Sequence, residues 1–308
     1  MVKRALAENK VSFQAHGTTY AGEATTIVRA ALKAGERLIA VVGGDGTLSE
    51  TAEGFFDLPG RSSDVADQLP VPIAADATLA ILPAGTGDDF ARGLLNKRAD
   101  INEWLHALVA HCQQTNETKR MRTVDVIYGN ATRGTRAFIC LNAVTLGLGA
   151  EVAESVAAQS RFMRRLPGEV RFVAAALNAL IDWRERLVRV TIDERDVINC
   201  SMNLLAITNG IYAGGGMMLA PAARPDDGKL DLLLACGLKH KDILRELQRI
   251  RRGEHLANAK VQHRQAQRVR VDTFAYEDAL PIEADGNVRG YTPAEFCLIP
   301  RALHVLVP

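Results

Sequence analysis

The fold is decided by one stretch, Leu38-Ile39-Ala40-Val41-Val42-Gly43-Gly44-Asp45-Gly46-Thr47, which precedes a segment with helical spacing. A buried strand that enters a glycine turn and then a helix is typical of an α/β sheet. Glycines allow a tight turn and close approach to a ligand, and the helix start offers free N–H groups to a phosphate. Asp45 repels a phosphate unless Mg²⁺ bridges the two or the carboxylate orients an acceptor hydroxyl. We call residues 43–47 the first glycine loop; the alternative interpretation is a plain capped turn.

A second junction of the same kind follows the apolar run at residues 78–82. It reads Leu82-Pro83-Ala84-Gly85-Thr86-Gly87-Asp88-Asp89-Phe90-Ala91-Arg92, and we call residues 83–88 the second glycine loop. Taken alone it predicts only a helix capped by Asp88 or Asp89. Two parallel strands that end in such loops place both at one edge of the sheet, where α/β folds bind ligands.

The length of 308 residues favours two domains. Residues 1–122 are expected to form an α/β nucleotide-binding domain with an open, mostly parallel sheet, with helices over 21–34, 48–56, 89–96 and 101–114 and a surface loop over 57–77. Residues 123–308 change to short strands and are expected to form an antiparallel β-sandwich. Its strands are expected at 124–128, 137–144, 187–192, 202–208, 230–234, 268–273 and 296–299, and helices at 151–164, 169–183 and 241–252. The final apolar run, 302–307, fits either domain.

Composition excludes several classes of protein. The chain has 37 basic and 36 acidic residues and a net charge of +1, so it has no overall field that would attract nucleic acid. Aromatic residues are 5%, too few for a base-stacking surface. The start lacks the apolar run of a secretory signal, and the longest apolar stretch is too short to span a bilayer. The five cysteines show no zinc spacing. We therefore expect a cytoplasmic protein with reduced thiols.

The two glycine loops together resemble the diacylglycerol kinase catalytic domain, in particular the bacterial lipid kinase group related to sphingosine kinases. The resemblance continues, in the same order, through Asn209-Gly-Ile-Tyr-Ala-Gly-Gly-Gly216, Ala220-Pro-Ala222, Asp227-Gly-Lys-Leu-Asp231 and Asp285-Gly286. It implies an α/β nucleotide domain, a C-terminal β-sandwich and an active site in the cleft between them. The implied reaction transfers the γ-phosphate of ATP, with Mg²⁺, to a lipid hydroxyl, most simply that of diacylglycerol. The lipid would be taken from a membrane surface by a cytoplasmic enzyme that associates with it transiently.

The resemblance also implies roles for individual residues. The ATP phosphates would be bound by Gly43, Gly44, Asp45, Gly46, Thr47, Leu48 and Ser49. Thr86 and, on a weaker motif, Thr18 match nucleotide-contacting threonines; Thr18 alone would be a turn residue. A family Mg²⁺ site corresponds to the Asp227 side chain and the carbonyls of Arg224 and Lys229, although an Asp-Gly hairpin turn is an equal alternative.

Two features depart from the family pattern. The family opens with a strand ending in Asn-Pro and a glycine-containing loop, and this sequence starts after it. Either an in-frame strand lies upstream of Met1, or the protein lacks this strand and part of its phosphate site. The family also has Asp-Gly-Glu near the C-terminus, where the glutamate accepts the hydroxyl proton. Here the sequence is Glu283-Ala-Asp285-Gly-Asn287, and an amide cannot be that base. In a strand, Glu283, Asp285 and Asn287 would share one face, and Asp285 or Asp45 could replace the base.

Two alternative functions stay open. NAD kinases also use Gly-Gly-Asp-Gly-Thr, but the second glycine loop and the Asp227 segment favour the lipid kinase. Asn287 favours a slow enzyme or a catalytically silent lipid- or nucleotide-binding protein. Basic segments at 160–166 and 245–252 are expected to be solvated helix faces, with a membrane-surface patch as the alternative.

Overall fold

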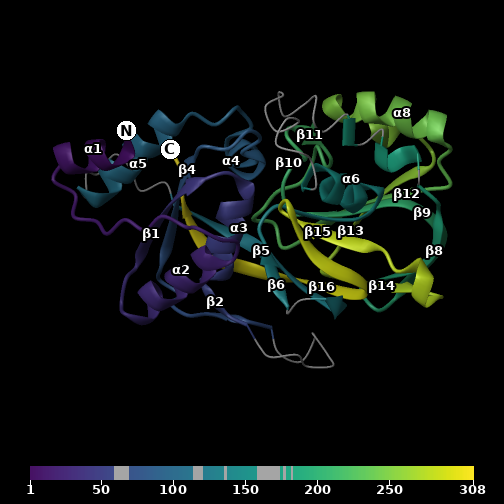
Figure 1. The fold of residues 1–308 in the computed structure, drawn as a ribbon, viewed down its shortest axis with the longest axis horizontal. Helices are drawn as coiled ribbons and strands as arrows, with labels where there is room; N and C mark the ends of the chain where they lie inside the picture. Colours follow the sequence, from purple (N-terminus) through teal and green to yellow (C-terminus); the bar gives the residue numbers. More distant parts are fainter. Residues whose placement is uncertain (59–68, 114–120, 135–136, 158–173, 176–177, 182) are drawn as a thin grey trace.

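The computed structural model describes residues 1–308 except 59–68, 114–120, 135–136, 158–173, 176–177 and 182. In Figure 1 the N-terminal half lies at the left and the C-terminal half at the right. One long strand, β16 (Asn287–Leu306), crosses between them. The N- and C-termini lie close together at the outer end of the N-terminal half.

The N-terminal half is built on two parallel strands, β1 (Leu38–Gly43) and β4 (Thr78–Pro83). They pair in register from Leu38 with Thr78 to Gly43 with Pro83, so both glycine loops leave the same edge. The short antiparallel strands β2 (Phe56–Asp57) and β3 (Val71–Pro72) pair with each other; β2 begins at the last residue of the predicted helix 48–56, and β3 lies in the segment predicted as a loop. The helices are α1 (Val2–Glu8), α2 (Glu23–Lys33), α3 (Asp45–Glu53), α4 (Asp89–Leu95) and α5 (Ile101–Cys112).

The C-terminal half is mainly antiparallel. After β16 the strand order is β14 (Arg268–Thr273), β8 (Arg186–Ile192), β9 (Asp196–Thr208), β12 (Leu230–Cys236) and β13 (Val261–Ala266), and β7 (Ala143–Gly147) and β15 (Pro281–Ala284) are attached to β9 and β16. Alternate residues of β8 are buried, as expected for a sheet with one face on a core. The remaining elements are β5 (Met121–Gly134), β6 (Phe138–Cys140), α6 (Leu148–Ala157), β10 (Tyr212–Ala213), β11 (Met217–Met218), α8 (His240–Arg249), η4 (Ile250–Arg252), η5 (Glu254–Ala257) and η6 (Tyr276–Asp278).

Strand β16 takes part in both hydrophobic cores. Phe296 and Leu298 pack in the core of the C-terminal half, and Leu303 and Val305 pack in that of the N-terminal half. The end of β16 runs parallel to β4, with His304 opposite Thr78. Strand β5 begins at Met121 and pairs with β16 in both halves. A single sheet therefore connects the two cores, which fixes the two halves relative to each other.

Two predicted elements between residues 137 and 164 differ from the structure. The predicted strand over 137–144 is two strands, β6 and β7, separated at Leu141 and Asn142. The amides of Leu141, Asn142 and Ala143 donate to the carboxylate of Asp285 at 2.8, 3.2 and 3.1 Å. Helix α6 begins at Leu148 instead of residue 151. The rest of the helix predicted to 164, most of the helix predicted over 169–183, and the basic segment 160–166 lie outside the described residues.

The prediction of five reduced thiols is wrong for one pair. Cys200 on β9 and Cys236 on β12 form a disulfide, with their Cα atoms 6.1 Å apart. This separation is within the usual range for a disulfide, and it arises because β9 and β12 are neighbours in the sheet. A sequence separation of 36 residues gives no sign of it. Cys112, Cys140 and Cys297 are free.

Candidate active site

The two glycine loops lie against each other at the carboxyl ends of β1 and β4. The carbonyl of Gly43 accepts a hydrogen bond from the Ala84 amide at 3.0 Å. A Cβ atom at Gly85 would lie 2.6 Å from the Gly44 Cα, so glycine is what allows this contact. Gly44 is the N-cap of α3, which begins at Asp45 and not at residue 48 as predicted. The helix start, with its unpaired amides, is therefore part of the loop itself.

The Asp45 side chain joins the first loop to helix α4. Its two oxygens accept hydrogen bonds from the amides of Asp89, at 3.1 Å, and Phe90, at 3.2 Å. Asp88 occupies the N-cap position of α4 with φ 46°, but its carboxylate accepts from the Gly85 amide at 2.9 Å and does not cap the helix. The cap that sequence assigns to Asp88 or Asp89 thus comes from Asp45, more than forty residues earlier.

Asp89 connects the second loop to the C-terminal half. One carboxylate oxygen accepts from the Gly215 amide at 2.7 Å, and the side chain is buried. Burial, with the nearby Asp45 charge, raises the pKa of Asp89 to about 6. Gly214, Gly215 and Gly216 all have positive φ, and a Cβ atom at Gly87 would lie 3.1 Å from the Gly215 Cα. The C-terminal half therefore touches the second loop through a backbone without side chains.

Asn287 lies beside the first loop, at the start of β16. A Cβ atom at Gly46 would lie 3.8 Å from the Asn287 Nδ2. This Nδ2 is buried and has no hydrogen-bond partner within the described part of the chain. A buried amide nitrogen without a partner, next to a helix N-terminus, is a hydrogen-bond donor that a bound ligand could satisfy. Asn287 is thus close to the first glycine loop.

Asp285 does not lie on a common strand face with Glu283 and Asn287, and that prediction is wrong. Asp285 and Gly286 form the turn between β15 and β16, with φ of 46° and 85°. The Asp285 carboxylate is buried against the three amides of residues 141–143, and burial raises its pKa. The Asp285 carboxylate therefore stabilises the connection between strands β6 and β7, and its oxygens are already occupied by backbone amides.

Glu283 lies close to the Asp285-Gly286-Asn287 motif, but the sequence alone does not indicate that its carboxyl group has unusual properties. Its carboxylate accepts from the Thr145 hydroxyl at 2.6 Å and from the Gly286 amide. Burial raises its pKa to about 7, against which the Thr145 and Gly286 hydrogen bonds work. A carboxyl group that titrates near neutrality therefore lies next to the turn that carries Asn287.

The remaining predicted nucleotide residues fall into two groups. Thr86 is exposed in the second loop, and Thr47 is half-buried at the start of α3. Leu48 packs in the N-terminal core, and the Ser49 hydroxyl donates to the Ile139 carbonyl at 3.5 Å, so these two side chains face the interior. Thr18 is exposed, in the segment before α2.

The predicted metal residues lie in a turn before β12. Asp227 accepts from the Lys229 amide at 3.1 Å, as in an Asp-Gly turn, and the guanidinium of Arg224 pairs with Asp226 at 3.3 Å. Burial raises the pKa of Asp227. Within the described residues, no three His, Cys, Asp or Glu side chains group as metal ligands. One exposed carboxylate with backbone carbonyls remains a suitable oxygen donor set for Mg²⁺.

Asp125 fixes this turn, and sequence reasoning missed it. It is fully buried on β5. Its carboxylate accepts from the Gly228 amide and from the Arg301 amide, each at 2.7 Å. The turn with Asp227 is therefore tied to β5 and β16, the two strands that both halves share. An apolar run interrupted by an acidic residue was the only available signal.

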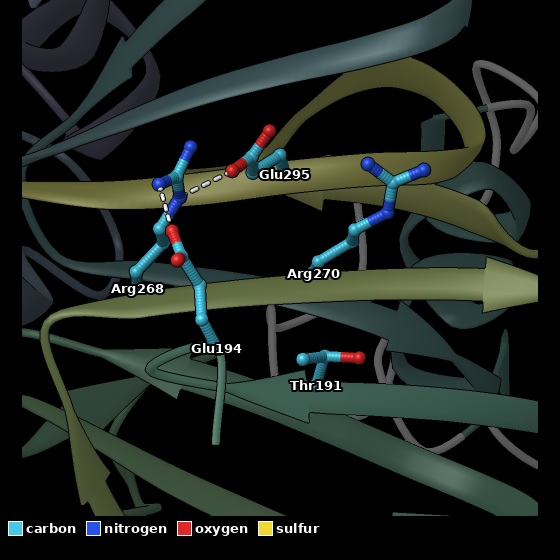
Figure 2. A pocket seen from close by; sticks show the side chains of 5 residues that line it. All are labelled: Thr191, Glu194, Arg268, Arg270 and Glu295. Atoms are coloured by element: carbon cyan, nitrogen blue, oxygen red, sulfur yellow. Dashed lines mark hydrogen bonds and ion pairs between the residues drawn. The ribbon is translucent and has the colours of Figure 1, made fainter. Parts of the chain in front are cut away.

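A cavity of about 190 Å³ lies elsewhere, on the sandwich, and Figure 2 shows its lining: Thr191, Glu194, Arg268, Arg270 and Glu295. Arg268 lies between Glu194 and Glu295 and pairs with both. Its charge is thus balanced within the protein. None of the residues predicted to bind nucleotide or metal lines this cavity.

The fold and the loops define a class of protein in which an α/β glycine-loop domain is completed by an antiparallel sandwich. The family described as "Diacylglycerol kinase catalytic domain" matches residues 1–124, and the "YegS C-terminal NAD kinase beta sandwich-like domain" matches residues 142–307. This chain belongs to the diacylglycerol kinase catalytic domain family, in its YegS-like lipid kinase group. The resemblance inferred from the motifs and the predicted fold class are confirmed.

Relatives and solved structures agree with this assignment. The chain is 31% identical to "Probable lipid kinase YegS-like" of Chromohalobacter salexigens, over 93% of this chain and 81% of that protein. It is 25% identical to the diacylglycerol kinase of Bacillus subtilis, over 95% and 85%. A diacylglycerol kinase crystal structure from Bacillus anthracis str. Sterne superimposes with a TM-score of 0.64 at 19% identity, covering 99% of this chain and 88% of that one. In the described part of the chain, no helix has the length and apolarity needed to cross a membrane.

Proposed function

We propose that this protein is an ATP- and Mg²⁺-dependent lipid kinase that transfers the γ-phosphate to a lipid hydroxyl, with diacylglycerol as acceptor and phosphatidic acid as product. The observation that supports it most is the contact of both glycine loops with residues of the C-terminal half, Gly215 and Asn287. Nucleotide-binding elements and the sandwich thus meet at one place. We place the enzyme in the cytoplasm, with transient visits to the membrane that holds its substrate.

The nucleotide phosphates would bind at the start of α3. The amides of Asp45, Gly46 and Thr47 precede the first intrahelical bond, which Leu48 makes to Gly44 at 3.0 Å. Helix N-termini of this kind bind phosphate. Gly43 and Gly44 keep the approach open, and the exposed Thr86 and Thr18 would add hydroxyl contacts. Leu48 and Ser49 act by anchoring the helix in the core.

Asp227, with the carbonyls of Arg224 and Lys229, would hold Mg²⁺, and Asp125 keeps their turn in place. When bound, Mg²⁺ supplies positive charge that helps to neutralise phosphate oxygens. Asp45 positions α4 through its two hydrogen bonds and so acts on geometry.

Asn287 would contact the acceptor hydroxyl but cannot take its proton. Phosphoryl transfer relies mainly on positioning and on charge stabilisation, so the loss of the base slows the reaction without abolishing it. Asp285 and Asp45 each hold two or more backbone amides, which makes them poor substitutes for the missing glutamate. We therefore propose an active but slow kinase.

The test is phosphate transfer from labelled ATP to diacylglycerol in detergent micelles, with product identified by chromatography. Labelled phosphatidic acid is the expected result. Transfer to NAD, with none to lipid, would show an NAD kinase instead. ATP binding without transfer to any lipid would support the silent binding protein that Asn287 also suggests.

A further inference from the structure

Helix α8 and the two short helices after it carry a basic surface with exposed leucines. Residues 239–257 contain six basic and three acidic side chains, a larger basic excess than the +1 of the whole chain. The exposed lysine, arginine and leucine side chains are Lys239, Lys241, Leu244, Arg245, Arg251, Arg252 and Leu256, which we call the α8 surface. Glu254 is the exposed acidic residue of the same segment. Lys241, Leu244 and Arg245 recur at helical spacing and so follow one side of α8, and Arg252 lies in η4, directly after it.

The acidic residues of α8, Asp242 and Glu246, are less exposed than its basic residues. Asp242 accepts from the Lys239 amide at 3.3 Å and has a 16% exposed side chain. It also pairs at 3.1 Å with Arg245, whose side chain is 62% exposed. Glu246 is buried and accepts from Asn258 at 3.0 Å and Arg249 at 3.1 Å. Asp242 and Glu246 thus offset part of the charge of Arg245 and Arg249, and the segment as a whole still has six basic side chains against three acidic ones.

The apolar residues divide in the same way. Ile243 and Ile250 pack in the core of the C-terminal half, whereas Leu244 and Leu256 are 44% and 37% exposed. Exposed leucines among lysines and arginines are the pattern of a helix that lies on an anionic lipid surface. A soluble anion would need the basic groups but not the leucines.

The α8 surface is also connected to the candidate active site. Gly253, between η4 and η5, lies against Pro221 and Met218. Met218 belongs to β11, which pairs with β10, and the Gly214–Gly216 turn between them reaches Asp89. Figure 1 shows α8 on the same side of the molecule as β10 and β11, with these strands toward α4.

We propose that the α8 surface docks this protein on a membrane containing anionic phospholipid and so presents the glycine loops to the lipid acceptor. The role given to docking, which is to bring the enzyme to its lipid acceptor, rests on the proposed function. The docking itself can be measured without ATP or turnover. It assigns the contact to α8 and its neighbours, where sequence alone favoured a solvated face.

The test is sedimentation with vesicles of phosphatidylcholine alone or with equal parts of phosphatidylglycerol. The protein is expected to bind only the anionic vesicles, with affinity that falls as salt is raised. Each basic residue at such a surface contributes about five-fold, so Lys241→Gln with Arg252→Gln should weaken binding about 25-fold. Leu244→Gln should weaken it about ten-fold. The charge-matched control, Lys10→Gln with Arg195→Gln, removes two exposed basic residues elsewhere and should bind like wild type.

Equal binding by the α8 variant and its control would refute the proposal. So would equal binding to both kinds of vesicle, or binding to a DNA polyanion with none to vesicles. Circular dichroism of each variant checks folding, since all substituted side chains are exposed. A dispersed short-chain diacylglycerol separates the two proposals: the α8 variant should phosphorylate it at the wild-type rate. If neither wild type nor the α8 variant phosphorylates the short-chain diacylglycerol, but wild type still binds anionic vesicles through α8, only the proposed function fails.

Discussion

The contact between the two glycine loops can be tested with a single methyl group, in Gly85→Ala. The new Cβ would lie 2.6 Å from the Gly44 Cα and 2.8 Å from an Asp88 oxygen. Carbon atoms pack at about 3.5–4.0 Å, so the loops must separate by about 1 Å. Gly85 does not have a positive φ, so the substitution is not strained by backbone conformation and the effect is steric. Overpacking of this kind costs about 1–3 kcal/mol in the free energy of unfolding.

The separation should also weaken nucleotide binding, because it moves the second loop away from the start of α3. Urea denaturation measures the unfolding free energy, and titration with ATP measures the dissociation constant. Gly17→Ala is the matched control, because a Cβ there meets nothing within 4 Å. Gly44→Ala should fall between the two, with its Cβ at 3.1 Å from the Gly85 Cα. If Gly85→Ala matched Gly17→Ala in both measurements, the close contact of the loops would be disproved.

Three further substitutions test the groups around the loops. Asp45→Ala removes both acceptors of the α4 amides and should cost about 1–2 kcal/mol of stability, which denaturation would measure. The same substitution removes a negative charge beside Asp89, so the pKa of Asp89 should fall, which NMR titration would measure. Glu283 has a pKa of about 7 in the folded protein and about 4.5 in the unfolded chain, so its burial makes the protein lose stability as pH rises from about 4.5 to about 7. Glu283→Gln should remove at most about 3 kcal/mol of that loss. A variant whose stability has the same pH profile as wild type would contradict this expectation. Asn287→Glu should raise the rate of lipid phosphorylation by about 10²-fold or more, and no change in rate would show that no base is missing.

Local patterns predicted the parts of the fold that depend on local chemistry. The apolar runs before Gly43 and Gly85 are the strands β1 and β4, and their parallel pairing brings the two loops together. The pattern of short strands after residue 123 predicted the antiparallel half. These features depend on burial and on glycine conformation, and both can be predicted from the residue types within a short segment of sequence.

The rest depends on partners that are distant in sequence. The cap of α4 comes from Asp45, and the break between β6 and β7 is stabilised by Asp285, which lies more than 140 residues away. The turn at Asp285 and Gly286 looked like a strand because alternate residues fit one. Spacing could not bring Cys200 and Cys236 together either, since their contact depends on strand order.

The use of the carboxylates explains how this family member can depart from its pattern at position 287. Asp45, Asp89 and Asp285 each bind backbone amides, and together they hold α4, the Gly215 turn and the Asp285 turn in fixed positions. Removing any of them would move the site, whereas Asn287 has a buried amide without a partner in the described chain, so its side chain supports no other element through Nδ2. A substitution at 287 is therefore expected to leave this geometry intact and, under the proposed function, to act on proton transfer. If positioning contributes most of the catalysis, Asn287→Glu should raise the rate without changing the affinity for ATP.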